Sequence, residues 1–195
     1  MVSKSELTRA RLQDGAMASF AEHGFHGTST RHIAAAAGMS PAAVYVHYPS
    51  KEALLYEITK TGHEQILGIV KTADASAPDA TTRLGNIVRE FVIYHAQHHA
   101  SSRVVNYEMT KLEPEHIAEI VAIRVLIDRT FTRVVEDGIA TGEFTVSDVA
   151  MTTTAISSLG IDVSRWFRDG RTWSPESVGD YYAGLTLAMV GARRP

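Results

Sequence analysis

The chain has 195 residues, of which 45% are hydrophobic and 21% are charged, a composition typical of a globular protein with a full core. It contains no cysteine, which excludes a disulfide framework, a thiolate zinc site and a cysteine nucleophile. The start, MVSKSELTRARLQDG, lacks the apolar run of a signal peptide, and no stretch approaches the ~18 apolar residues of a membrane span. We therefore expect a soluble cytoplasmic protein without a membrane partner.

Charge is distributed unevenly along the chain. Residues 1–60 carry six Lys or Arg against five Asp or Glu, a balance of +1, whereas residues 61–195 carry 13 against 17, a balance of −4. The basic tilt of the first third permits nucleic-acid binding there, but it is too small to establish it.

Two helices are predicted at the start of the chain. The first spans about 8–23, with its apolar residues on one face, and Gly24 supplies the C-terminal stop. Ser29 is expected to cap a short second helix, TRHIAAAA, which ends at Gly38.

A third short helix follows directly. Ser40 and then Pro41 form a strong start signal, a capping hydroxyl followed by proline at the first helical position. This helix must end near Tyr48, because Pro49 disfavours helical geometry in the residue before it.

The rest of the chain also reads as helix, and period-two alternation is scarce. The predicted fold class is therefore all-α, with an N-terminal domain over 1–52 and a larger helical domain over 53–195. Further helices are predicted from Ser50 to the seventies and over 79–98, 104–111, 114–142, 147–167 and 175–192.

The two short helices separated by GMS have the layout of a helix-turn-helix over about 28–48, whose second helix enters the major groove of DNA. A wheel at ~100° per residue places Pro41, Val44 and Tyr48 on the face expected to be buried. Ala42 and Val46 lie opposite, where small apolar side chains can touch thymine methyl groups.

The flanks of this helix carry polar groups. Tyr45 projects from one flank, and His47 with Ala43 from the other, so that a hydroxyl and an imidazole can reach phosphates. Lys51 stands in the first turn of the next helix, where the macrodipole disfavours a cation by ~0.3–1 kcal/mol. A bound phosphate would compensate for that unfavourable position.

The segment TSTRHIAAAAGMSPAAVYVHYPSKEALL resembles the DNA-binding domain of the TetR family of transcriptional regulators. The resemblance covers about residues 8–60 and implies an N-terminal three-helix domain that binds double-stranded DNA. It implies phosphate contacts from Thr28, Ser29, Ser40, Tyr45, His47 and Lys51, and base contacts from Ala42, Ala43 and Val46. Many members of the family carry Arg, Asn, Gln or Lys on the recognition helix, and this chain has none between Pro41 and Tyr48. Specificity would then come from DNA shape or from contacts made elsewhere.

The family resemblance also implies a helical ligand-binding domain whose last two long helices form a four-helix bundle with a second subunit. A homodimer of this kind would bind a palindromic operator. The final predicted helix fits, because it mixes an apolar repeat with small residues that allow close helix packing. These residues are Val178, Tyr182, Leu185 and Met189, with Ala183, Gly184, Ala188 and Gly191. The alternative is packing within one subunit.

Three histidines, His95, His98 and His99, share a helix face and invite a metal-binding interpretation. No carboxylate pattern accompanies them, and two stand at a helix end where polar residues are common. We predict no metal and no cofactor, and the role of this cluster is left open.

The C-terminal half resembles a TetR subgroup found with lipid and steroid catabolism genes, whose effectors are acyl-CoA thioesters. The resembling pieces are the His-His pair before VVNYE, the long helix after LEPEH, SRWF and VGDYYAGLTLAMVGA. The implied effector-binding residues are Tyr94, His98, Met109, Arg165 and Trp166. Arginines there could bind phosphate or carboxylate groups, and aromatic rings the adenine or acyl part. A charged helix end with a buried aromatic side chain is the structural alternative, and a lipophilic drug is the competing effector.

No enzyme motif is present: the sequence has no GxSxG, no HExxH and no glycine-rich phosphate loop. A small-molecule binder that has lost DNA binding is a further class, and the residues Tyr45, His47 and Lys51 argue against it. The sequence predicts a ligand-responsive transcriptional regulator that acts as a repressor. The alternative is a repressor of an efflux pump that senses lipophilic drugs.

Overall fold

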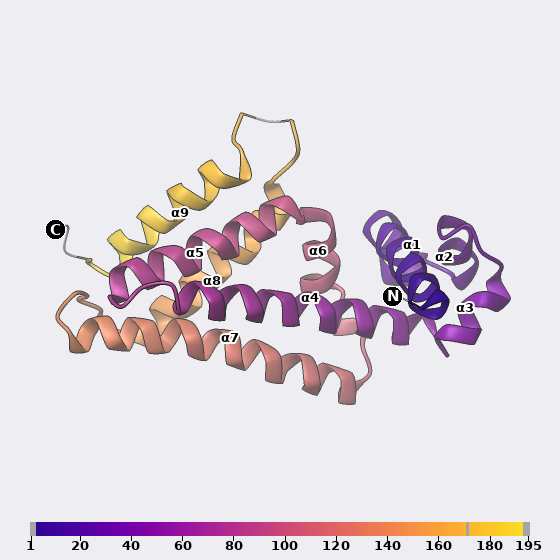
Figure 1. The fold of residues 1–195 in the computed structure, drawn as a ribbon, viewed down its shortest axis with the longest axis horizontal. Helices are drawn as coiled ribbons and strands as arrows, with labels where there is room; N and C mark the ends of the chain where they lie inside the picture. Colours follow the sequence, from indigo (N-terminus) through magenta and orange to yellow (C-terminus); the bar gives the residue numbers. More distant parts are fainter. Residues whose placement is uncertain (1–2, 171, 193–195) are drawn as a thin grey trace. The chain divides into compact units, whose positions relative to one another are not determined.

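The structure is a computed structural model that describes residues 3–170 and 172–192 (Figure 1). All regular secondary structure in these residues is helical, which confirms the all-α prediction. Packing divides the chain into a first unit, residues 1–62 with 100–120, and a second unit, residues 63–99 with 121–195. The functional boundary after residue 52 stays a prediction, and the packing groups residues 100–120 with the N-terminal helices.

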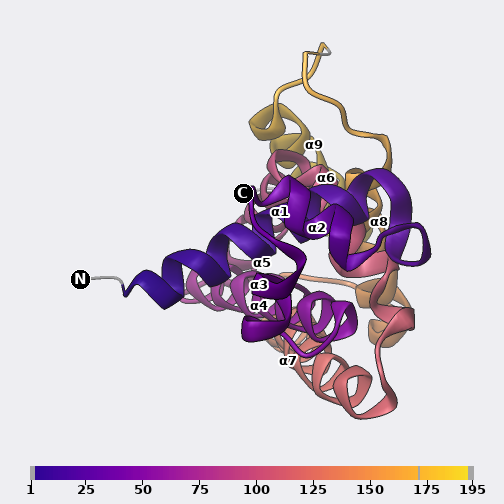
Figure 2. The same ribbon diagram turned by 90° about the vertical axis from the view of Figure 1, so that its right-hand side faces the viewer.

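The first unit contains three N-terminal helices, which Figure 2 shows together, and parts of three later ones. Its elements are α1 (Lys4–Gly27), α2 (Thr30–Ala36), α3 (Pro41–His47), the start of α4 (Lys51–Asp74), most of α6 (His99–Tyr107), the 3-10 turn η1 (Met109–Lys111) and the start of α7 (Pro114–Ala140).

Helix α1 begins before the position that the apolar pattern predicts. Ser3 accepts a hydrogen bond from the N–H of Glu6, and the Glu6 carboxylate accepts one from the N–H of Ser3. This capping box fixes the start at Lys4 instead of residue 8. The predicted break is present at Gly24, with φ 67°, but one further turn continues to Gly27.

The short helices α2 and α3 begin and end where the sequence predicts. Ser29 accepts a hydrogen bond from His32 N at 3.2 Å, and Ser40 accepts one from Ala43 N at 3.3 Å. Tyr48 then turns to extended geometry ahead of Pro49. The starts of both helices of the motif are therefore marked by local capping signals.

The core of the first unit joins α1, α2 and α3 to residues of α4, α6 and α7. A Cβ on Gly15 of α1 would lie 2.9 Å from the Ala37 N and 3.0 Å from the Ile33 O, so glycine is required where the backbone of α2 approaches. The buried apolar residues are Leu12, Ala16, Phe20, Phe25, Ile33, Ala34, Ala37, Val44, Tyr48, Leu54, Leu55, Ile58, Val104, Val105, Leu112 and Ile120.

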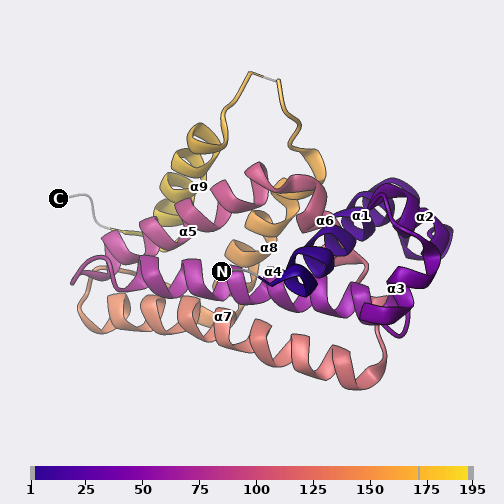
Figure 3. The ribbon, with the colours of Figure 1, turned by 45° about the vertical axis from the view of Figure 1, so that its right-hand side comes forward.

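The second unit consists of the remainder of α4 and α7 with α5 (Ala80–Gln97), α8 (Val149–Trp166) and α9 (Pro175–Met189). Helix α9 runs beside α5, as Figures 1 and 3 both show. Asp148, and not the predicted Ser147, caps α8, because its carboxylate accepts a hydrogen bond from Met151 N.

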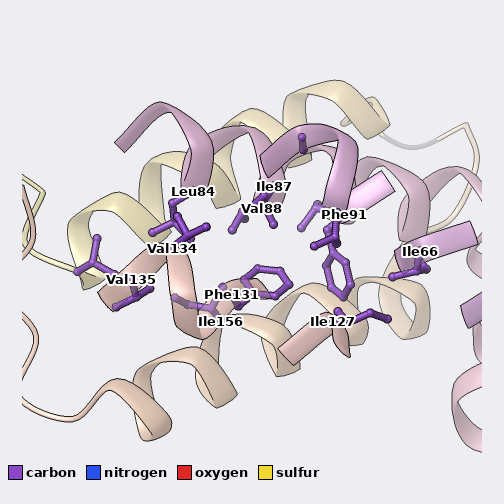
Figure 4. Packing of buried hydrophobic residues seen from close by; sticks show 14 of the residues in the cluster. Ile66, Leu84, Ile87, Val88, Phe91, Ile127, Phe131, Val134, Val135 and Ile156 are labelled. Atoms are coloured by element: carbon purple, nitrogen blue, oxygen red, sulfur yellow. The ribbon is translucent and has the colours of Figure 1, made fainter. Parts of the chain in front are cut away.

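The core of the second unit is formed by residues of α4, α5, α7, α8 and α9, and Figure 4 shows part of it. At its centre the rings of Phe91 and Phe131 meet edge to face, with centroids 5.6 Å apart. The predicted inner face of α5 is confirmed: Leu84, Val88, Phe91, Val92 and His95 are all buried.

Charged side chains join the helix ends of this unit. Asp74 of α4 pairs with Arg83 of α5 and Arg133 of α7. The Glu143 carboxylate accepts hydrogen bonds from the N–H groups of Ala80 and Thr81 at the start of α5. Burial raises the pKa of Glu143, but these hydrogen bonds and those from the Thr81 and Thr141 hydroxyls outweigh it and hold the pKa at about 2.

None of the helices in the described part of the chain is long and apolar enough to cross a membrane.

Candidate nucleic-acid interface

Helix α3 has one buried face and one solvent-exposed face. Val44 and Tyr48 are buried, as the wheel predicts, and Val46 on the opposite side is 79% exposed. Ala42, one turn before Val46, is exposed as well. Pro41 differs from the prediction: it is exposed, because it stands at the first helical position.

Two α1 arginines hold the C-terminal ends of α2 and α3. Arg11 donates to the Ala37 carbonyl at 2.8 Å, and Arg9 donates to the His47 carbonyl at 3.2 Å. Arg9 also lies 4.5 Å from the centroid of the Tyr48 ring. Cations are favourable there because the last carbonyls of a helix have no partner within it and carry partial negative charge.

Lys51 of α4 holds the C-terminal end of α1 in the same way, by donating to backbone carbonyls. Its ammonium donates to the Phe25 carbonyl at 2.7 Å and to the Thr28 carbonyl at 2.8 Å, and it lies 4.3 Å from the Phe25 ring centroid. The position of Lys51 in the first turn of α4 is thus compensated inside the protein. A bound phosphate is therefore not needed to compensate for this position, and a direct phosphate contact of Lys51 stays a prediction that the salt dependence of DNA binding tests.

Thr28 also has partners inside the protein. Its side chain is buried, and its hydroxyl donates to the Ser19 carbonyl at 2.9 Å and the Gly24 carbonyl at 2.8 Å. These contacts fix the junction between α1 and α2, and the phosphate contact of Thr28 stays a prediction.

The other predicted DNA contacts lie on or beside α2 and α3. Tyr45 is 58% exposed, and its hydroxyl lies 3.2 Å from the Thr30 hydroxyl, which ties α3 to α2. Ser40 is exposed, while Ser29, Ala43 and His47 are half-buried. Both serines accept a capping N–H, which leaves the O–H of each hydroxyl as a donor.

Arg31 is a candidate contact that the sequence analysis did not single out. It is exposed in the first turn of α2, and within residues 3–170 and 172–192 no side chain pairs with its guanidinium. The sequence alone could have identified it, because Arg31 is the single Lys or Arg between Ser29 and Tyr48.

A cluster of polar side chains in the first unit joins α4 to the start of α7. His116 lies 2.7 Å from the Glu52 carboxylate and stacks on the Tyr56 ring with centroids 3.8 Å apart. Tyr56 donates to the Glu119 carboxylate at 2.6 Å, which also accepts from Lys60 at 3.1 Å.

Two of the predicted effector residues line a groove of the second unit. Tyr94 and His98 line a groove of about 830 Å³ between α4 and α5 of the second unit, and their rings are 4.6 Å apart. The groove is mixed in character, with amides, hydroxyls and one carboxylate beside small and apolar side chains. Its lining residues are Gln65, Gly68, Ile69, Thr72, Ala73, Ser76, Asn86, Glu90, Tyr94 and His98.

The other three predicted effector residues are not among those that line this groove. Arg165 is exposed at the end of α8, 3.3 Å from the Asp162 carboxylate, and Trp166 is half-buried. Met109 packs against the core of the first unit. Arg171, which follows Arg165 and Trp166 in the sequence, lies outside the described residues.

The three histidines of the proposed cluster point to different partners. His95 is buried with its Nδ1 2.7 Å from the Phe91 carbonyl, and burial lowers its pKa to about 4. His98 lies against Tyr94, and His99 lies 3.3 Å from the Asp169 carboxylate. Within the described residues, no group of three or more His, Asp or Glu side chains could hold a metal ion.

Comparison with known proteins agrees with the geometry of both units. Residues 12–58 match the family model described as bacterial regulatory proteins, tetR family. Residues 77–190 match the tetracyclin repressor-like C-terminal domain. The chain belongs to the TetR family. TetR proteins are transcriptional regulators with a helix-turn-helix DNA-binding domain, which confirms that the chain is a regulator and not an enzyme.

Individual relatives extend the comparison. A TetR-family regulatory protein from Rhodococcus RHA1 is 42% identical, with a TM-score of 0.92 over 99% of this chain and 100% of that one. The HTH-type transcriptional repressor KstR2 of Rhodococcus jostii (strain RHA1) is 25% identical over 92% of this chain and 89% of its own length. AibR, solved with isovaleryl coenzyme A and operator DNA, is 19% identical with a TM-score of 0.85, covers 95% of this chain and all of its own, and shows the fold alone. None of these three supports the efflux-pump alternative.

Proposed function

We propose that this TetR protein is a homodimeric repressor that acts in the cytoplasm, binds a palindromic operator through α3 and leaves it when a small effector binds. The observation that carries the proposal is the bare outward face of α3, where Val46 is 79% exposed on a helix whose opposite face is buried. A recognition helix needs such a face, because it must fit between the walls of the major groove.

The contacts of this interface divide into two kinds. Ser29, Ser40, Tyr45 and His47 donate to phosphates, and the exposed Arg31 joins them as the cation of the set. Phosphate contacts fix the position of the helix, and base contacts select the sequence. Facing the bases are Ala42, Ala43 and Val46.

Exposed apolar stripes on α8 and α9 support the homodimer. Met151 and Leu159 stand on α8 with 68% and 41% exposure, and Tyr181 and Leu185 stand on α9 with 71% and 40%. Residues spaced by four or eight positions share one helix face. A Cβ on Gly184 would meet nothing within 4 Å among the residues that the structure describes, so this mid-helix glycine faces away from them. A second copy covering α8 and α9 accounts for both features.

The effector we propose is an acyl-CoA thioester. The chain is similar to KstR2 over most of its length, and the solved AibR complex contains isovaleryl coenzyme A. Tyr94 and His98 offer ring faces in the groove, and Arg165 offers an exposed guanidinium for phosphate.

The DNA-binding proposal is tested by selecting duplexes from random DNA with the full-length protein, followed by gel shifts. We expect enrichment of an inverted repeat whose half-site centres lie about one helical turn, or a multiple of it, apart. Absence of any enriched sequence would contradict the proposal.

The effector proposal is tested with a panel of CoA thioesters of increasing acyl length. At least one should raise the melting temperature and release the selected operator, and Arg165→Ala should reduce both effects. Arg129→Ala is the matched control, because Arg129 is an exposed arginine on α7. If no thioester shifts the melting curve, the effector class is wrong.

A further inference from the structure

Helix α3 lacks the side chains that usually read base edges. Bidentate contacts to guanine come from Arg or Lys, and those to adenine come from Asn or Gln. The seven residues of α3, PAAVYVH, include none of these. Sequence selection by α3 must therefore use other chemistry.

Val46 offers that chemistry. Among the described large hydrophobic residues it has the greatest exposure, 79%, above Tyr181 and Met151. Ala42 extends the same exposed apolar face by one turn. Both branches of Val46 end in methyl groups, which can gain free energy only by leaving water against another apolar group.

The position of Val46 is held from both ends of α3. Ser40 caps its first turn, and Arg9 holds the His47 carbonyl at its last residue. Tyr45, the neighbour of Val46, is tied to Thr30 of α2 at 3.2 Å. A β-branched side chain on a helix also has one strongly preferred rotamer. The methyl groups are thus presented at a defined place.

The edges of the base pairs in the major groove carry one apolar substituent, the 5-methyl group of thymine. We infer that Val46 reads a thymine in each operator half-site through this methyl group. The inference rests on the proposed operator binding and adds the chemistry by which one base is chosen. Cytosine and uracil lack the methyl group at the same ring position, so they are the discriminated bases.

The test uses operators selected from random DNA by the full-length protein. The selected half-site should contain a thymine at one fixed position, and that thymine is then replaced by deoxyuridine. Loss of one buried methyl group should weaken binding about fourfold per half-site and roughly fifteenfold when both are replaced. Deoxyuridine at a thymine outside the conserved positions is the DNA control.

Val46→Ala supplies the protein arm of the test. This variant should bind the thymine operator more weakly and should show no further loss with deoxyuridine, because the two changes remove the same contact. Its melting temperature should match that of the parent, since the side chain is exposed.

Each outcome decides a separate question. If Val46→Ala loses as much affinity to deoxyuridine as the parent does, or if the parent ignores deoxyuridine, Val46 does not read a methyl group while operator binding stands. If no sequence is enriched, both the operator binding and this inference are overturned.

Discussion

Different interactions stabilise the interior of each of the two units. In the first unit, cations of α1 and α4 donate to the carbonyls that end three helices, as Lys51 does to Phe25 and Thr28. In the second unit, long helices pack around large apolar side chains such as Phe91 and Phe131. Polar contacts to backbone require particular residues at particular positions, whereas apolar contacts tolerate exchange at constant volume. Single polar residues such as Lys51 are therefore expected to matter most in the first unit, and filled apolar volume in the second.

The largest expected effect concerns packing in the second unit. Phe131 is fully buried at its centre, so Phe131→Ala should lower the free energy of unfolding by about 3–5 kcal/mol. Phe131→Leu should cost much less, because most of the volume is kept. Denaturant unfolding followed by circular dichroism measures both variants. Equal losses would show that the second unit does not depend on filled volume.

The next effect concerns the cations of the first unit. Lys51→Ala removes two charge-assisted hydrogen bonds and should lower the free energy of unfolding by about 2–3 kcal/mol. It should leave the salt dependence of operator binding nearly unchanged. Arg31→Ala should do the opposite, reducing the slope of log K against log [salt] by about two, one for each half-site of the palindrome, without a change in stability. Gel shifts at several salt concentrations separate the two, and a lower slope for Lys51→Ala would assign a phosphate contact to it.

A smaller effect concerns pH and the start of α5. The pKa of Glu143 is about 2, below its usual 4.5, so its carboxylate stabilises the fold above about pH 4.5 and this stability is lost as the pH falls toward 2. Glu143→Gln should lower the free energy of unfolding at pH 7 by on the order of 1 kcal/mol and flatten its decline between pH 5 and 3. Thermal melts across this range measure the effect, and the exposed Glu136→Gln is the control. A parallel decline in both variants would contradict the role of Glu143.

Two mid-helix glycines have opposite surroundings, and the smallest expected effect is at Gly68. A Cβ on Gly68 in the second unit meets nothing within 4 Å, so Gly68→Ala should stabilise the protein by about 0.5–1 kcal/mol. A Cβ on Gly15 in the first unit would lie 2.9 Å from the Ala37 N, so Gly15→Ala should destabilise it. Melting temperatures that move in the same direction for both would contradict these local structures.

Much of the first unit could be predicted because its signals are local. Ser29 and Ser40 mark the starts of α2 and α3, and Pro49 marks the end of α3. The roles of Thr28 and Lys51 could not be predicted in this way, because their partners are carbonyls that only the folded chain brings near. The sequence correctly identified Lys51 as an unusual cation in the first turn of a helix. The structure explains its position by the carbonyls of Phe25 and Thr28, to which it donates.

The predicted effector residues show more clearly which contacts cannot be predicted from sequence. Tyr94 and His98 are brought to one groove by helical spacing, which the sequence reveals. Whether Arg165 joins them depends on how α8 packs, and no local pattern encodes that packing. Arg165 instead lies beside Asp162 of its own helix.

A binding titration decides whether two chains bind one operator together. Fluorescence anisotropy with the selected palindromic duplex and a scrambled duplex gives the specificity ratio, and titration at high concentration gives the stoichiometry. We expect two chains per palindrome and binding at least about a thousandfold tighter than to the scrambled duplex at the same salt concentration. Equal affinity for the two duplexes, or one chain per palindrome, would contradict the account.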